Sequence, residues 1–302
     1  MSVTQKAAAS AGRAVPGDSV PRRVGRAALR PFRPADQVAE AVEVGRRLQR
    51  STATGRRIVV DDLGTGADTA VVTALLARSY AHYRHDRVLA VDATGRSPSL
   101  GTRLGAEEAP DLAEGVDGAA FEVAREGLAQ TGDGLWTVAT ARDDAAVYAS
   151  RLLPLSRFFG VTLVAGGAGA AFTDVVGESA HARVWVVRAT RAATARVGRA
   201  LDLFVQGGRE DEARRTVVVL FDERRREDPR LDAVRAGRIV AESGAGVVRL
   251  AHDRHLAQGG EVRTRRIAEA THRTILDAAA EALNRAVDGD HPYSETRKGE
   301  RL

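Results

Sequence analysis

Two glycines and a threonine lie in a pattern that could bind phosphate. Gly64 and Gly66 lie in a short turn after an apolar run, and Thr69 stands where a helix is expected to begin. Backbone N–H groups of such a turn and the positive end of the following helix both attract anions. The spacing therefore predicts a phosphate cradle in this turn, and a second predicted strand, which ends at Asp92, follows it.

The same stretch fits a second pattern at least as well. Asp62 to Asp68, with an acidic strand end at Asp92, has the form of the glycine loop that binds S-adenosylmethionine in methyltransferases. A purely structural interpretation also exists, because Asp and Thr are favoured at helix N-termini and an Asp after a strand commonly caps a loop. The local pattern leaves these alternatives open.

The elements that must position these residues follow a regular alternation. Apolar runs predict strands at 58–62, 87–92, 135–139, 161–164, 183–188, 216–221 and 246–250. Between and after them, helices are predicted at 69–83, near 121–129, near 143–158, and at 190–206, 229–242 and 264–287. Strands that alternate with helices give an α/β fold with a mostly parallel sheet covered by helices on both faces.

The chain divides by composition into four parts. Residues 1–34 carry seven basic residues and one acid, so this leader accounts for the whole net charge of +5 and is expected to be disordered. Residues 35–55 are predicted to form an amphipathic helix and a linker, 56–288 a single folded domain, and 289–302 a polar tail. The leader suggests an arm that contacts DNA or an anionic membrane.

Several classes of protein are excluded by the residues that the chain lacks. It contains no cysteine, so neither a disulfide nor a thiolate metal site forms. No apolar run reaches about 18 residues, so no transmembrane segment is expected, and we expect a cytoplasmic protein. The histidine pairs His82/His85 and His252/His255 have no third ligand close in sequence, so no metal site is predicted.

Three segments beyond the glycine turn resemble one known family. They are Val88–Ala93 with Ser99–Gly105, then Val161–Gly169, and last Val248–Gly260. In order and spacing they are similar to segments of the MinD/ParA P-loop ATPases, most of all the MinD-like proteins of actinobacteria associated with type VII secretion. The resemblance covers roughly residues 56–287. It implies a P-loop NTPase-type sheet and favours that family over a methyltransferase.

The residues on which the family's chemistry depends are replaced. Where the family writes Lys-Gly-Gly-x-Gly-Lys-Thr-Thr, the phosphate-binding lysine position is Asp68 and the signature lysine position is Leu63. The aspartate that follows the later strand is matched by Ala165, and the base-binding asparagine by Phe221. A like-charge contact at 4 Å costs roughly 4 kcal/mol at an effective dielectric of 20, so Asp68 would repel a phosphate.

The resemblance therefore implies a pseudo-ATPase, with Gly64, Gly66, Thr69 and Asp92 as a vestigial nucleotide site. We expect a scaffold or adaptor that acts through protein partners, in type VII secretion or in intracellular positioning, with no cofactor. ATP with Mg²⁺ would bind if the site were still competent. The alternatives are a weak ATP-binding switch, an S-adenosylmethionine-binding enzyme and a non-specific DNA binder.

Overall fold

A computed structural model describes residues 17–18, 35–52, 54–115, 118, 120–226 and 228–289, with the side chains of 35–41 excepted. The predicted leader 1–34 and tail 289–302 therefore lie almost wholly outside the described residues, and their predicted properties stay predictions. Within the described part of the chain, no helix combines the length and apolar character that crossing a bilayer requires.

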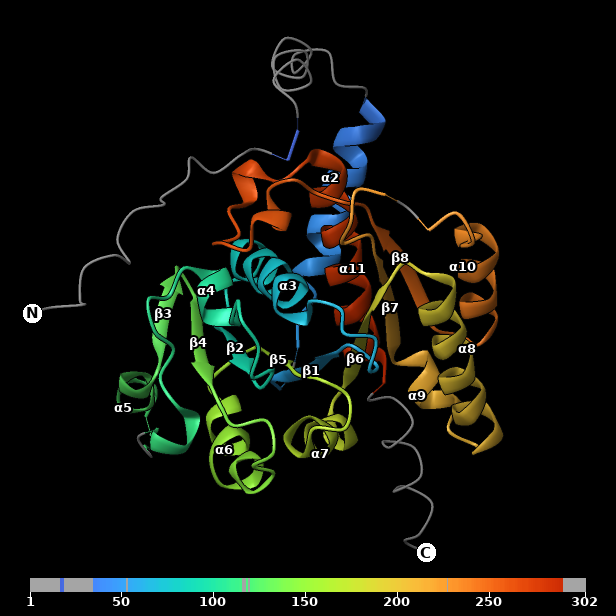
Figure 1. Cartoon of the computed structure of the whole chain (residues 1–302). Helices are drawn as coiled ribbons and strands as arrows, with labels where there is room; N and C mark the ends of the chain where they lie inside the picture. The colour runs from blue at the N-terminus through green and yellow to red at the C-terminus, as the bar shows by residue number, and fades with distance from the viewer. Residues whose placement is uncertain are drawn as a thin grey trace, which may run out of the picture.

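One eight-stranded sheet forms the centre of the molecule (Figure 1), in the order β3-β4-β2-β5-β1-β6-β7-β8. All neighbouring strands are parallel except β3 and β4. The strands are β1 (Arg56–Asp61), β2 (Val88–Asp92), β3 (Ala129–Gly132), β4 (Leu135–Ala139), β5 (Val161–Ala165), β6 (Ala182–Arg188), β7 (Thr216–Phe221) and β8 (Gly246–Leu250). The predicted α/β class with a mostly parallel sheet is confirmed.

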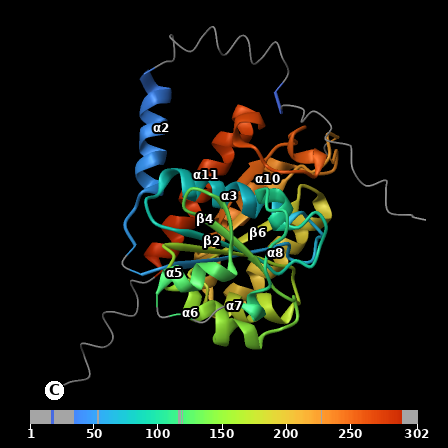
Figure 2. The ribbon, with the colours of Figure 1, turned by 90° about the vertical axis from the view of Figure 1, so that its left-hand side faces the viewer.

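Helices cover both faces of the sheet, as Figure 2 shows from the side. On one face lie α2 (Ala35–Leu48), α3 (Thr69–Tyr83) and α11 (Glu269–Asp288). Alternate strand residues such as Ile58 and Val60 point to this face and pack among the buried side chains of α3 and α11. The helix α2 packs on α11, where Val44 and Leu48 join the same core.

The other face carries two further apolar clusters. Val59 and Val164 pack with residues of η4 (Tyr148–Leu152) and α7 (Ala171–Ser179). Trp185 and Val187 pack with residues of α8 (Arg191–Gln206), α9 (Glu210–Arg214) and α10 (Ala233–Glu242). Because neighbouring residues of a strand point to opposite faces, a strand buried on both sides reads as a continuous apolar run.

The sequence-based elements differ from the structure mainly at short helices. The predicted helix near 143–158 is helical only over η4 and α6 (Leu153–Ser156). The predicted helix near 121–129 is the single turn α5 (Phe121–Ala124) with η3 (Arg125–Gly127), and the edge strand β3 follows directly. The helices α7 and α9 were not predicted, and α10 and α11 begin four to five residues later than expected. A remaining short helix, α4 (Leu100–Leu104), follows β2.

Candidate functional site

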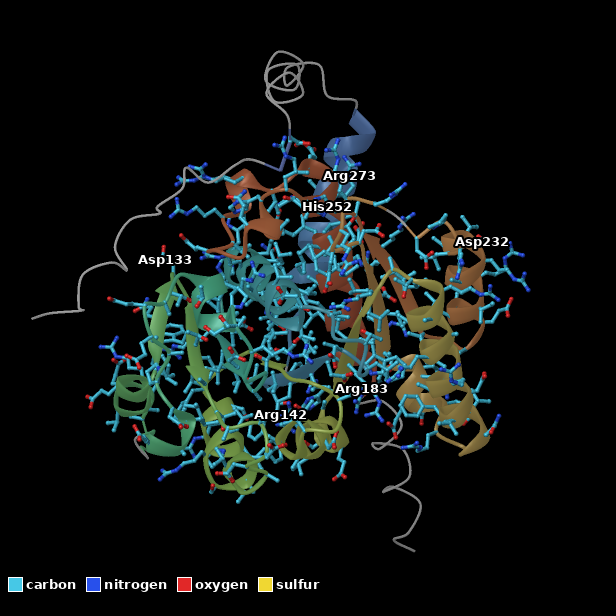
Figure 3. All side chains as sticks on the ribbon, viewed as in Figure 1. Asp133, Arg142, Arg183, Asp232, His252 and Arg273 are labelled. Carbon is cyan, nitrogen blue, oxygen red and sulfur yellow. The ribbon has the colours of Figure 1, made fainter. Side chains whose placement is uncertain are left out.

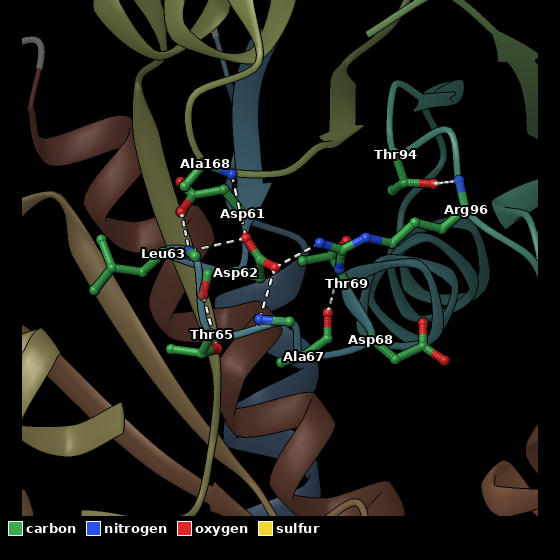
Figure 4. Close-up of polar contacts among 12 residues, drawn as sticks. Asp61, Asp62, Leu63, Thr65, Ala67, Asp68, Thr69, Thr94, Arg96 and Ala168 are labelled. Carbon is green, nitrogen blue, oxygen red and sulfur yellow. Dashed lines mark hydrogen bonds and ion pairs between the residues drawn. The ribbon is translucent and has the colours of Figure 1, made fainter. Parts of the chain in front are cut away.

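The glycine loop lies at the carboxyl edge of the sheet, where β1 is flanked by β5 and β6 and β2 adjoins β5. In parallel α/β sheets ligands bind at this edge, near the point where the strand order changes direction. The loops after β1, β2 and β5 meet there (Figure 4). The turn itself needs glycine, because Gly64 and Gly66 have φ angles of +69° and +72°.

The carboxylate of Asp62 lies inside the cradle of the loop. Its Oδ1 accepts hydrogen bonds from the backbone N–H of Gly64 (3.0 Å) and of Ala168 (3.2 Å). Its Oδ2 accepts from the N–H of Gly66 (3.0 Å) and from Nη2 of Arg96 (2.9 Å). The side chain is only 1% exposed. A negative group of the chain itself therefore occupies the N–H groups that the sequence predicted for phosphate (Figure 4).

Two more N–H groups of the loop donate to carboxylates. The N–H of Leu63 donates to Oδ1 of Asp61 (2.9 Å), and Asp61 also pairs with Arg183 (3.2 Å). Arg183 lies on β6 and is labelled in Figure 3. The N–H of Asp68 donates to Oε1 of Glu223 (2.7 Å). Four amides of the turn thus have an acidic side chain of the chain itself as their hydrogen-bond partner.

Asp68, which the resemblance above matched to the family's lysine, has two structural roles. Its carboxylate caps α3 by accepting from the N–H of Val71 at 3.0 Å, and it forms an ion pair with Arg103 of α4. Arg103 is 5% exposed and also donates to the carbonyl of Leu256 (3.2 Å). The negative charge of Asp68 is therefore neutralised by a buried arginine from a different segment.

Three of the four predicted site residues lie together, and the fourth, Asp92, makes its contacts in a different loop. Gly64, Gly66 and Thr69 lie together in one loop, and the Thr69 hydroxyl donates to the carbonyl of Gly166 (3.2 Å). Both carboxylate oxygens of Asp92 are used within its own loop. One accepts from the N–H and hydroxyl of Thr94 (2.9 and 2.7 Å) and the other from the N–H of Leu100 (2.6 Å). Asp92 thus adopts the loop-capping arrangement weighed as an alternative above.

Arg96 and Glu223 belong to the site, but the sequence analysis did not predict them as site residues. Arg96 lies in the loop after β2 and bridges the carboxylate of Asp62 to the carbonyl of Ala67 (3.1 Å). A basic residue four positions beyond a strand end was the available signal for it. Glu223 follows β7 and lies 155 residues beyond Asp68, so no local pattern connects the two.

The adjacent acids Asp61, at the end of β1, and Asp62, at the start of the loop, differ in their tendency to ionise. Burial raises the pKa of Asp61 above its ordinary value, although Arg183 and the N–H of Leu63 oppose this. Burial acts on Asp62 in the same direction. There the hydrogen bonds from Ala168, Arg96 and Gly64 outweigh it and hold the pKa of Asp62 below its ordinary value. Asp62 is therefore held as a carboxylate in the cradle.

A cavity of about 310 Å³ adjoins the loop. Its polar lining includes the carboxylates of Asp68 and Glu223, and the guanidinium groups of Arg103 and Arg188 that pair with them. A triphosphate in this cavity would meet these two carboxylates together with the arginines that pair with them. Within the described residues, no group of three His, Cys, Asp or Glu side chains could hold a metal ion.

Comparison with known proteins identifies the architecture. No family model matches the sequence, and no curated protein matches it. Solved structures do match. The MinC:MinD cell division complex of Aquifex aeolicus aligns with a TM-score of 0.58 at 17% identity, over 76% of this chain and 96% of that chain.

The fold is that of the MinD and ParA ATPases. A ParA family ATPase from Chlorobium tepidum aligns with a TM-score of 0.58 at 16% identity, over 76% of this chain and 98% of that one. McdA of Cyanothece, solved in complex with ATP, aligns with a TM-score of 0.55 at 17% identity, over 77% and 98%. The predicted MinD/ParA-like fold is confirmed, and at these identities the likeness concerns the fold alone.

Proposed function

We propose that this chain is a pseudo-ATPase with the MinD/ParA fold, which acts as a cytoplasmic scaffold or adaptor without binding nucleotide. One observation carries the proposal: the N–H groups of the glycine loop already donate to the carboxylates of Asp61, Asp62 and Glu223. A phosphate would have to displace these acids and then lie beside them. In addition, Leu63 stands where the family has its second lysine, and Ala165 stands where it has an aspartate near Mg²⁺.

The partner of such a scaffold is a protein. MinD of Aquifex aeolicus is known in a complex with MinC, so this fold supports docking of a second protein. The segments Val88–Ala93, Ser99–Gly105 and Val248–Gly260 resemble type VII secretion-associated proteins. This resemblance favours a partner protein from the secretion or positioning machinery. Cross-linking in cells followed by mass spectrometry tests this choice. Recovery of neither class of component above a control with an unrelated bait contradicts it.

A thermal-shift series tests the absence of a ligand. The purified chain is heated alone and with millimolar Mg-ATP, Mg-ADP or S-adenosylmethionine. A ligand at a hundred times its Kd stabilises by about 2.7 kcal/mol, and we expect no shift with any of the three. A ParA-type ATPase measured beside it supplies the positive control. A shift with Mg-ATP would replace the proposal by a nucleotide switch, and a shift with S-adenosylmethionine alone by an enzyme.

The nucleotide switch is the second candidate, and the cavity beside Thr69 favours it. At about 310 Å³ it reaches the lower end of the range for small-molecule sites, roughly 300–1,000 Å³. A switch would require the carboxylate of Asp62 to leave the loop when ATP enters. Dimerisation that depends on Mg-ATP, measured by light scattering, would support this candidate, and a mass unchanged by nucleotide would oppose it.

A further inference from the structure

Asp62 connects three separate loops through one carboxylate. It holds the glycine loop through the N–H groups of Gly64 and Gly66 and the loop after β5 through the N–H of Ala168. Through Arg96 it holds the loop after β2, and Arg96 in turn bonds to the carbonyl of Ala67. These loops lie at residues 62–68, 93–99 and 166–170. The described structure thus has an anion at the centre of this edge of the sheet, and the anion belongs to the chain.

A bound phosphate would engage an edge of this kind in the same way. An anion at the end of a parallel sheet accepts from backbone N–H groups of a glycine turn, and arginine is a common further partner of it. Ordering of flanking loops by such contacts is a recurrent way in which a ligand sets the conformation of a protein. Here a carboxylate with four donors supplies those contacts, and its loops need no ligand to become ordered.

We infer that Asp62 is a permanent internal substitute for a bound anion, which fixes the loops after β1, β2 and β5 in one conformation. This inference rests on the proposed absence of nucleotide and adds a consequence to it. The face made by the three loops is preset, so a partner that recognises it binds with or without nucleotide. Asp61 does not share this role, because within the described residues its carboxylate accepts hydrogen bonds from Leu63 and Arg183 alone.

Hydrogen exchange followed by mass spectrometry tests the inference on the full chain. Asp62→Asn keeps the shape of the side chain and removes its charge, so it weakens contacts to all three loops. Hydrogen bonds to charged groups are strong enough that losing one accelerates local opening about tenfold to a hundredfold. We expect faster exchange in peptides covering 62–68, 93–99 and 166–170 together. Faster exchange confined to 62–68 would overturn the inference.

Asp92→Asn is the matched control. It removes a charge of the same size from the end of β2, which β5 separates from β1. Among the described residues, the carboxylate of Asp92 accepts hydrogen bonds from Thr94 and Leu100 alone. We expect it to accelerate exchange at 93–100 and to leave 166–170 as in the wild type. If Asp92→Asn loosens 166–170 as much as Asp62→Asn does, the coupling is not specific to Asp62 and the inference fails.

Two further variants keep the test decisive if Asp62→Asn folds poorly. Arg96 is 44% exposed, so Arg96→Gln should fold, and it should accelerate exchange at 93–99 and not at 166–170. In Asp62→Gly the missing group has the size of acetate. Acetate at tens of millimolar should restore slow exchange in all three segments, whereas chloride at equal ionic strength should not. An equal effect of acetate and chloride would overturn the inference. None of these outcomes depends on whether the wild type binds ATP.

Discussion

A lysine at position 68, as in the family's motif, should lower the stability of this protein and should not give it nucleotide binding. In Asp68→Lys the helix α3 loses its N-cap, and Arg103 loses the carboxylate with which it pairs. The new ammonium would lie beside the buried guanidinium of Arg103, at the positive end of a helix. Arg103 and the helix end both repel a positive charge. The carboxylate of Glu223 also lies close to residue 68, but it is already paired with Arg188.

The expected loss of stability follows from these contacts. Removing an N-cap costs about 0.5–2 kcal/mol. Breaking a buried ion pair costs about 3–5 kcal/mol, and the lower end applies here because the Asp68 side chain is 29% exposed. We expect a total of roughly 3.5–5 kcal/mol in the free energy of unfolding. At about 2–4 °C per kcal/mol this lowers Tm by roughly 7–20 °C.

Urea and thermal denaturation monitored by circular dichroism measure the loss. Asp68→Ser is the matched control, because serine still caps the helix and only the ion pair is removed. It should therefore lie between the wild type and Asp68→Lys. The double variant Asp68→Lys/Arg103→Glu restores opposite charges and should recover about 0.5–3 kcal/mol relative to the sum of the single variants.

Two results would refute the reasoning. The first is a Tm of Asp68→Lys equal to that of the wild type, which would mean that the pair with Arg103 contributes nothing. The second is tight binding of Mg-ATP by Asp68→Lys alone. That result would show that the missing lysine, and not the carboxylates of Asp62 and Glu223, is what keeps nucleotide out.

The remaining predictions concern the charge and packing of the site and of other parts of the chain. Folding lowers the pKa of Asp62, so this carboxylate contributes its full stabilisation above the unfolded pKa of about 3.9 and loses it as the pH falls through the folded pKa. In urea denaturation, the free energies of unfolding of the wild type and of Asp62→Asn should therefore differ far more at pH 7 than at low pH. Gly166→Ala should destabilise by about 1–3 kcal/mol, because a Cβ there would lie 2.0 Å from Oγ1 of Thr173. Gly198→Ala in α8, where a Cβ meets nothing within 4 Å, should instead stabilise by about 0.5–1 kcal/mol, and calorimetry distinguishes the two signs. Deleting residues 1–34 removes a net charge of +6, so any binding of the chain to DNA, measured by fluorescence anisotropy at several salt concentrations, should weaken and lose most of its salt dependence.

The sequence alone determined the architecture of the sheet. Runs such as Val217–Phe221 and Val184–Val187 are apolar at every position, which suits only strands buried on both faces, and the alternation with helices then requires parallel pairing. The start of α3 was also predicted at the correct residue, because Asp68 and Thr69 combine cap chemistry with a preceding glycine turn. The helices α7 and α9 were missed, since nine and five residues form too few turns for a helical period to be detected.

The identity of the anion in the cradle was decided only by the tertiary structure. The sequence placed Gly64, Gly66 and Asp62 in one loop, but it did not reveal that the carboxylate turns back onto the N–H groups of its own turn. That geometry depends on Arg96 and Ala168, which approach from loops 34 and 106 residues away. Likewise, the sequence alone indicated that Asp68 would repel a phosphate, whereas the structure places Arg103 beside its carboxylate. The sequence shows the sign of each charged side chain but not which group it contacts. Folding decides that contact, and the contact decides whether the side chain repels a ligand or takes its place.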